Sequence, residues 1–162
     1  GSFGAAVSFD VVLHLHDRLR AFRAIRRALV PGGRFLFTDA GVVTGSISSE
    51  DVALRSMHGF VRFSAPGFNE GALEASNLKL MEVEDRTESL LRNAQGRLNA
   101  RVRYQADFEQ LEGAAGFARY QTYLQSVISL SETGALARLM YLAEVGPANT
   151  TSRVPPDRLK VD

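Results

Sequence analysis

The chain has 162 residues, of which 45% are hydrophobic and 23% charged, and its formal net charge is +1. These values are ordinary for one globular domain, and the near-zero net charge argues against a protein directed mainly at nucleic acid. Because the sequence has no cysteine, it excludes disulfides, thiolate metal ligands and thiol nucleophiles. No apolar run reaches membrane-spanning length, so we expect no membrane association and a cytoplasmic location.

The first forty residues have the pattern of a β-α-β unit. Ala5 to Ser8, preceded by Phe3-Gly4, predicts a short buried strand. Asp17 is a good helix N-cap, and apolar residues at spacings of three and four predict a helix from there to about Arg27. The sequence Pro-Gly-Gly ends this helix, and residues 34–38 form a second, nearly continuous apolar strand. The two strands should be parallel, with a right-handed crossover.

The rest of the chain alternates helical and strand patterns. A Gly/Ser-rich loop follows Asp39. The elements expected after it are a helix over 49–58, a short helix over 69–76, a strand over 78–85, a helix over 87–109, a break at 113–116, a helix over 117–133 and a last strand over 136–144. The tail from residue 146, rich in proline and polar residues, is expected to be disordered.

The order of these motifs resembles a known family. The segment Arg23 to Arg34, which reads R-A-I-R-R-A-L-V-P-G-G-R, closely resembles the R-x-x-R-x-L-x-P-G-G pattern of class I S-adenosylmethionine-dependent methyltransferases, and with the strand that follows it is similar to their second half. The run F-D-x-x-L-H-x-x-D-R, residues 9–18, looks like methyltransferases that act on small amines, of the glycine, sarcosine and dimethylglycine type. The strands L-x-x-x-E-D-R-T, residues 80–87, and R-L-M-Y-L-A-E, residues 138–144, resemble the closing antiparallel pair. The resemblance covers about residues 2–145.

The resemblance implies an α/β fold with a Rossmann-like doubly wound sheet, incomplete on its N-terminal side and carrying a helical insertion, residues 87–133, before the last strand. The family's glycine-rich cofactor loop is not in this sequence. Three preceding βα units correspond to roughly 90 residues. We therefore expect residues 1–145 to be the C-terminal half of a methyltransferase domain, a fragment with little or no activity alone.

The candidate site follows the first strand, because ligands of open α/β sheets bind outside the carboxyl ends of the strands. By resemblance, Ser8, Phe9 and Asp10 would meet the methionine part of S-adenosylmethionine. Asp10 and His14 would line the boundary between this cofactor and the methyl acceptor, where His14 takes a proton from an ammonium substrate or positions it. The alternatives are that Asp10 caps a short helix and that His14 is a half-buried histidine with satisfied hydrogen bonds.

A second group of candidates lies where relatives often bind the acceptor. Asp39 either orients the substrate or hydrogen-bonds the loop behind it. His58, Phe60 and Arg62, with nearby aromatic residues, either form a cage for a methylated ammonium or pack in a core under a long loop. We expect no metal, because His14-Leu15-His16-Asp17 lacks a full ligand set.

The function implied is transfer of a methyl group from S-adenosylmethionine to a small-molecule acceptor, and we expect this acceptor to be an amine. Two alternatives remain open: a non-catalytic module that associates through an exposed sheet edge, and a nucleic-acid binder that uses the five arginines of the helix after Asp17. The resemblance places that helix outside the sheet, where such a face is usually only solvated, so we expect no nucleic-acid partner. The helices over 87–133 either cover the acceptor site or form a homodimer interface.

Overall fold

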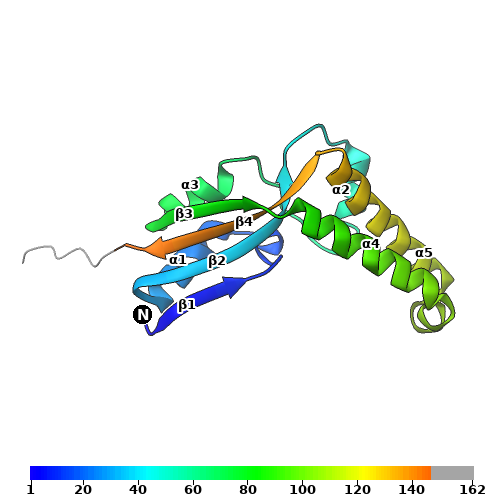
Figure 1. The fold of residues 1–162 in the computed structure, drawn as a ribbon, viewed down its shortest axis with the longest axis horizontal. Helices are drawn as coiled ribbons and strands as arrows, with labels where there is room; N and C mark the ends of the chain where they lie inside the picture. The colour runs from blue at the N-terminus through cyan, green and yellow to red at the C-terminus, as the bar shows by residue number, and fades with distance from the viewer. Residues whose placement is uncertain (147–162) are drawn as a thin grey trace, which may run out of the picture.

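The computed structural model describes residues 1–146 around a four-stranded mixed sheet (Figure 1). Across the sheet the strands are β1 (Phe3–Ser8), β2 (Leu29–Val43), β4 (Leu136–Val145) and β3 (Leu78–Asp85). The pair β1–β2 is parallel and the pair β3–β4 is antiparallel, as the sequence predicted. The predicted disordered tail lies, from residue 147 on, outside the described residues.

The main core lies between the sheet and helices α1 (Arg18–Ala28) and α3 (Phe68–Glu74). Helix α1 begins at Asp17, whose side chain accepts a hydrogen bond of 2.8 Å from a backbone N–H three residues on. The apolar face of α1 places the ring of Phe22 in full burial, 5.5 Å and 5.0 Å from two ring centroids of β2. Helix and sheet are therefore joined by aromatic contacts on the apolar helix face that the helical spacing predicted.

The first strand differs from the expectation of a buried element. Phe3 and Val7 are 64% and 60% exposed. The reason is that β1 is an edge strand of the described sheet, hydrogen-bonded to β2 alone. A second correction concerns the Gly/Ser-rich loop after Asp39, because β2 continues to Val43 and its last two residues pair with Ala137 and Leu136 of β4.

Three helices differ from their predicted bounds. Helix α2 (Ser49–Arg55) ends three residues before the expected 58. Helix α4 (Thr87–Arg103) stops before 109, because the backbone of Tyr104 leaves the helical region at φ −112° and ψ 34°. Helix α5 (Gln105–Glu132) follows, with a kink at Gly113, where φ is +76° and where the sequence predicted a break. A left-handed φ of this kind is readily adopted by glycine.

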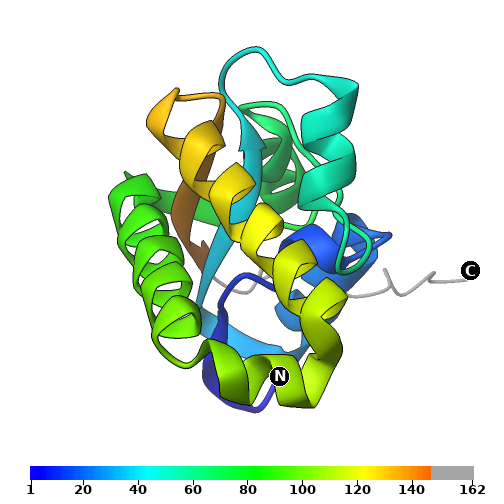
Figure 2. The same ribbon diagram turned by 90° about the vertical axis from the view of Figure 1, so that its right-hand side faces the viewer.

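Helices α2, α4 and α5 gather beyond one end of the sheet (Figure 2). Helices α4 and α5 pack against each other through the buried side chains of Ala94, Leu124 and Val127. The parallel strands β1 and β2 reach their carboxyl termini at this end of the sheet, as Figure 1 shows. No helix within residues 1–146 is both long enough and apolar enough to cross a membrane.

Candidate active site

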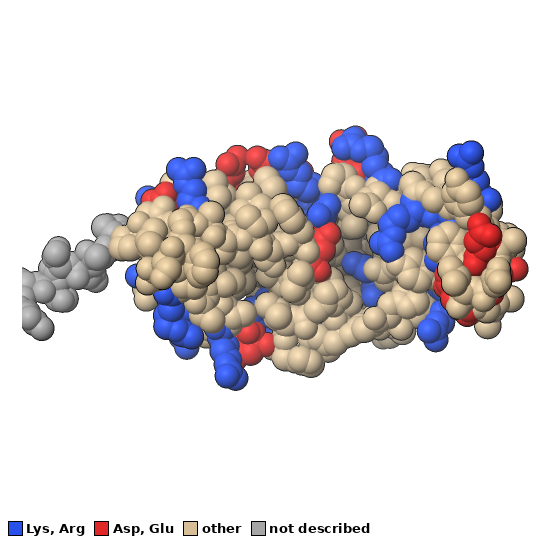
Figure 3. Space-filling view, turned by 90° about the horizontal axis from the view of Figure 1, so that it is seen from below, with Lys and Arg blue, Asp and Glu red and all other residues tan. Residues whose placement is uncertain are grey.

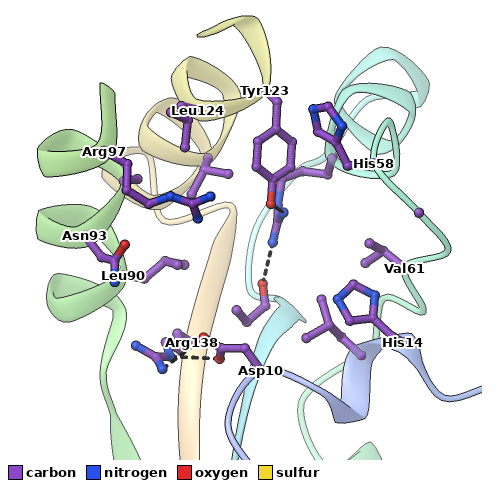
Figure 4. A pocket seen from close by; sticks show the side chains of 16 residues that line it. Asp10, His14, His58, Val61, Leu90, Asn93, Arg97, Tyr123, Leu124 and Arg138 are labelled. Carbon is purple, nitrogen blue, oxygen red and sulfur yellow. Dashed lines mark hydrogen bonds and ion pairs between the residues drawn. The ribbon is translucent and has the colours of Figure 1, made fainter. Parts of the chain in front are cut away.

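A cavity of about 260 Å³ opens at the carboxyl ends of β1 and β2, below α4 and α5 (Figure 4). Apolar side chains from Leu13, Leu90 and Leu124 form part of its wall. The acidic, basic and imidazole side chains of the lining are those of Asp10, His14, Arg55, His58, Arg97 and Arg138, and Tyr123 adds a phenol. Three of the sequence candidates, Asp10, His14 and His58, are thus brought together, although they come from different segments.

Asp10 connects the end of β1 to the strands β2 and β4. Its carboxylate accepts from Arg138 in a two-point contact, with Nε to Oδ1 at 3.0 Å and Nη2 to Oδ2 at 2.9 Å. Thr38 of β2 donates its hydroxyl to Oδ1 at 2.8 Å and accepts from the Asp10 N–H at 2.9 Å. The expectation that Asp10 caps a short helix is wrong, because the 3₁₀ turn Val12–His14 begins at Val11 without a side-chain cap.

His14 is held in one tautomer. Its Nδ1 lies 2.7 Å from the backbone oxygen of Phe60. Because a carbonyl oxygen only accepts, Nδ1 carries the proton. The neutral ring therefore keeps a lone pair on Nε2, and His14 is able to accept a proton from a ligand.

His58 lies between the segment after α2 and helix α5. Its ring centroid is 4.7 Å from that of Tyr120 and 5.0 Å from that of Tyr123. Burial lowers the pKa of His58 below its usual value of 6.5, and the positive charges of Arg119 and Arg101 lower it further. His58 is therefore neutral at pH 7.

The lowered pKa of His58 predicts a pH dependence of stability. As the pH falls through 6.5 toward the lowered folded value, the unfolded chain binds protons more readily than the folded chain. The free energy of unfolding therefore falls on acidification in this window and is unaffected by His58 above it. Urea unfolding at several pH values measures this slope, and His58→Gln should make it shallower. Equal slopes for the two proteins would contradict the assignment.

Two arginines of the lining carry charges that no carboxylate balances. Arg55 is only 5% exposed and donates to the Tyr123 hydroxyl at 2.9 Å and to the Ala40 backbone oxygen at 3.1 Å. Arg97 donates to the hydroxyl of Tyr120. Among residues 1–146, neither arginine forms a salt bridge with an aspartate or glutamate. This wall of the cavity is electropositive.

Asp39 is fully buried and does not line the cavity. One carboxylate oxygen accepts from Arg18 at 2.6 Å, Asn69 at 2.9 Å and Ser64 at 3.1 Å, and the other accepts from the Gly41 N–H at 2.9 Å. Of the two roles considered for Asp39, hydrogen bonding to the loop behind the strand is the one that these contacts fit.

The buried ion pair between Arg18 and Asp39 is also connected to the loop after α2, which carries Phe60 and Arg62. Arg18 also donates to the backbone oxygen of Arg62 at 2.6 Å, and the Arg62 N–H donates to the Leu13 oxygen at 2.7 Å. Arg18 is 2% exposed, so it does not belong to the solvated basic face that the sequence suggested for α1. Instead, it fixes the loop after α2 against the loop after β1.

The remaining candidates lie outside this cavity. Ser8 ends β1 and Phe9 follows it, neither residue lines the cavity, and Phe9 is largely exposed. Phe60 stacks on His16 at 4.0 Å, and Arg62 lies over the ring of Phe68 at 5.4 Å. The aromatic cage considered for a methylated ammonium is therefore not assembled at the cavity, where His58 is the one acceptor candidate present.

Sequence reasoning missed the three lining arginines, which lie on α2, α4 and β4. Arg138 had a detectable pattern, because it is a charge inside the apolar strand sequence LARLMYLAE. A charge in such a strand requires a partner, and Asp10 supplies it. Arg55 and Arg97 have no comparable pattern, because their position depends on how α2 and α4 dock. Within the described part of the chain, no group of three or more metal-ligating side chains is present.

The sequence and the fold were compared with known proteins. A family described as a methyltransferase domain matches residues 1–37. A search of curated proteins finds no match. Among solved structures, a putative sarcosine dimethylglycine methyltransferase from Galdieria sulphuraria matches with a TM-score of 0.78 and 19% identity, over 90% of this chain and 53% of that one.

Two further structures extend this result. Haemonchus contortus phosphoethanolamine N-methyltransferase 2, in complex with phosphomonomethylethanolamine and S-adenosylhomocysteine, has a TM-score of 0.77 and 21% identity over 90% of this chain and 34% of that one. The cyclopropane synthase MmaA2 from Mycobacterium tuberculosis has a TM-score of 0.80 and 15% identity over 86% and 54%. The predicted resemblance to class I methyltransferases and the Rossmann-like fold are confirmed, and the chain spans about half the length of the first of these structures.

Proposed function

We propose that this protein, which has the fold of class I methyltransferases, transfers a methyl group from S-adenosylmethionine to an amine nitrogen of a small-molecule acceptor. The proposal rests on the cavity at the carboxyl ends of β1 and β2, which both Asp10 and His14 line. In open α/β sheets this is where ligands bind. The similar Haemonchus contortus enzyme was solved with phosphomonomethylethanolamine and S-adenosylhomocysteine.

The residues at the end of β1 fit the reacting part of this cofactor. S-adenosylmethionine supplies an electrophilic methyl group on a positively charged sulfonium. Asp10, held by Arg138 and Thr38, lies at the cavity wall, and the exposed ring of Phe9 offers apolar surface at the end of β1. Ser8, Phe9 and Asp10 would hold the methionine end. The nucleoside end would be held by elements other than those described here.

The chain's own residues would then align the acceptor and remove its proton. Methyl transfer needs the nitrogen lone pair in line with the methyl group, so orientation contributes much of the rate. An ammonium must first lose a proton, and the free Nε2 of His14 is placed to accept it. Helices α4 and α5 line one side of the cavity (Figure 4).

Replacing His14 with glutamine should lower kcat at pH 7 by about 10²- to 10⁴-fold, the range for loss of a general base. The deficit should shrink at high pH, where the amine is already neutral. The assay follows methyl transfer from radiolabelled S-adenosylmethionine to a panel of small amines, using the protein expressed from its complete reading frame. His16→Gln is the matched control, because His16 does not line the cavity. A His14→Gln variant with an unchanged pH profile would remove the base role.

Residues 1–162 alone are proposed to have little or no activity, because the chain carries no glycine-rich cofactor loop. Titration of this chain with S-adenosylhomocysteine tests the point, and micromolar affinity would contradict it. Association through the β1 edge, as a homodimer or with another chain, stays a prediction that the exposed Phe3 and Val7 favour.

A further inference from the structure

We propose that a second cavity, between helices α4 and α5, binds a small organic anion with a flat apolar body, such as an aromatic carboxylate, at Arg101. This second cavity has a volume of about 290 Å³. It lies toward the turn that joins α4 to α5, away from the sheet (Figure 1). The ligand is not the methyl acceptor, and the binding site does not depend on the proposed function.

The second cavity is separate from the candidate active site. All of its lining residues belong to α4 and α5, and none belongs to a strand or to the loop after β1. Arg97 lines both cavities, and the other lining residues of the second cavity do not line the first. The residues that line the second cavity are Arg97, Ala100, Arg101, Phe108, Glu112 and Tyr120.

The first argument is that one edge of the Arg101 guanidinium lacks a partner. Arg101 is 7% exposed, and its Nη1 lies 2.9 Å from Oε1 of Glu112. Its Nε and Nη2 are buried and have no hydrogen-bond partner among residues 1–146. Buried nitrogens of this kind are normally hydrogen-bonded, because their removal from water is costly. Nε and Nη2 form the edge of a guanidinium that binds a carboxylate through two parallel hydrogen bonds, so a carboxylate is the group that fits them.

The second argument is the charge of the lining. It contains two guanidinium groups, those of Arg97 and Arg101, and one carboxylate, that of Glu112. Arg97 donates to the hydroxyl of Tyr120 and forms no salt bridge within residues 1–146. One positive charge is therefore not balanced, which matches a ligand with a single negative charge. Figure 3 shows several basic side chains on the part of the surface that the helices form.

The third argument is the aromatic surface around the same guanidinium. The central carbon of the Arg101 guanidinium lies 4.5 Å, 5.1 Å and 4.3 Å from the ring centroids of Phe108, Phe117 and Tyr120. Stacking on these rings holds the guanidinium plane in one orientation. Two of the rings, those of Phe108 and Tyr120, line the cavity, and Ala100 adds apolar surface. An aromatic ring of a ligand would pack against this surface, which an inorganic anion would not use.

The alternative is that Arg101 only joins α4 to α5. Such a role uses the ion pair with Glu112 and the ring faces of α5. It does not use Nε and Nη2, whose hydrogen bonds would be lost on folding without return. The two roles make different predictions for ligand binding, and only the binding site requires that Arg101 meets an anion.

Calorimetric titration with benzoate, acetate and benzamide tests the chemistry of the ligand. Benzoate carries both the carboxylate and the ring, whereas acetate lacks the ring and benzamide lacks the charge. Benzoate should bind with a Kd of about 1 mM or below, and each of the other two should bind about 10-fold more weakly. Absence of benzoate binding at about 10 mM, or equal binding of benzoate and benzamide, would overturn the proposal.

Two variants of the ion pair should change the affinity for benzoate in opposite directions. Arg101→Gln should weaken binding by about 10-fold or more, because the charge and the two-point contact are lost. Glu112→Gln should strengthen binding, because it leaves Arg101 without its counter-charge. Damage to the packing of α4 on α5 would weaken binding in both variants, and that result would overturn the proposal. If Arg101→Gln does not fold, the absence of any gain in Glu112→Gln overturns it alone.

Two control variants locate the ligand. Arg92→Gln removes an arginine from the same helix, exposed and outside both cavities. Asn93→Ala changes a residue that lines the first cavity and not the second. Both should keep the wild-type affinity for benzoate. Weakened binding in Asn93→Ala with normal binding in Arg101→Gln would place benzoate in the candidate active site and overturn the proposal.

Discussion

Replacing Asp39 with alanine is expected to lower the free energy of unfolding by about 3–5 kcal/mol, the cost of leaving one partner of a buried ion pair without the other. The guanidinium of Arg18 lies 2.6 Å from Asp39, and the two side chains are 1% and 0% exposed. Asn69 and Ser64 would lose an acceptor in the same step. Urea unfolding followed by circular dichroism measures the loss.

The matched control is an ion pair of the same kind on the surface. Arg92 and Glu88 are 2.5 Å apart on α4 and are 69% and 80% exposed. Glu88→Ala should cost no more than about 0.5 kcal/mol. Adding Arg18→Met to Asp39→Ala should recover part of the loss, because it removes the unpaired charge. A loss below about 1 kcal/mol for Asp39→Ala would show that the pair does not hold the loop.

Replacing Asp10 with asparagine is expected to lower kcat/KM for methyl transfer by about 10²-fold, because small displacements of a positioned reacting group have effects of this size. Asparagine cannot balance the charge of Arg138, whose two nitrogens lie 2.9 Å and 3.0 Å from the Asp10 carboxylate. The attachment of the loop after β1 to β4 would weaken, and Arg138 at the cavity wall would be left without its counter-charge. The effect should appear in kcat as well as in the affinity for S-adenosylmethionine.

Asp17→Asn is the matched control for Asp10→Asn. Asp17 is a nearby aspartate that accepts a backbone N–H at the start of α1 and does not line the cavity. Asparagine caps helices about as well as aspartate, so stability and turnover should be retained. Equal activity of Asp10→Asn and the wild-type protein, with intact folding by circular dichroism, would remove Asp10 from the site.

Local patterns predicted the parts of the fold that depend on neighbouring residues. The strand over 78–85 and the N-cap Asp17 agree with the structure because alternation, capping and helical spacing act over a few residues. The exposure of β1 was not predictable in this way. An apolar strand reads as buried in sequence, whereas its exposure depends on which strands lie beside it.

The candidate site was also predictable only in part from the sequence. Asp10 and His14 were found because the fold rule places functional side chains directly after a strand. Arg55 and Arg97 were not found, because they reach the cavity only after α2 and α4 have docked over the strand ends. Of the two interpretations of the loop after α2, the contacts fit packing better than a cage, since Phe60 stacks on His16 and Arg62 lies over Phe68.

The measurement that tests this account most directly is a crystal structure of the protein with S-adenosylhomocysteine and a small amine. The account predicts the cofactor sulfur beside Asp10, at the strand end of the cavity, with the amine near Nε2 of His14. A sulfur atom bound away from the carboxyl ends of β1 and β2, with the cavity empty of acceptor, would contradict it.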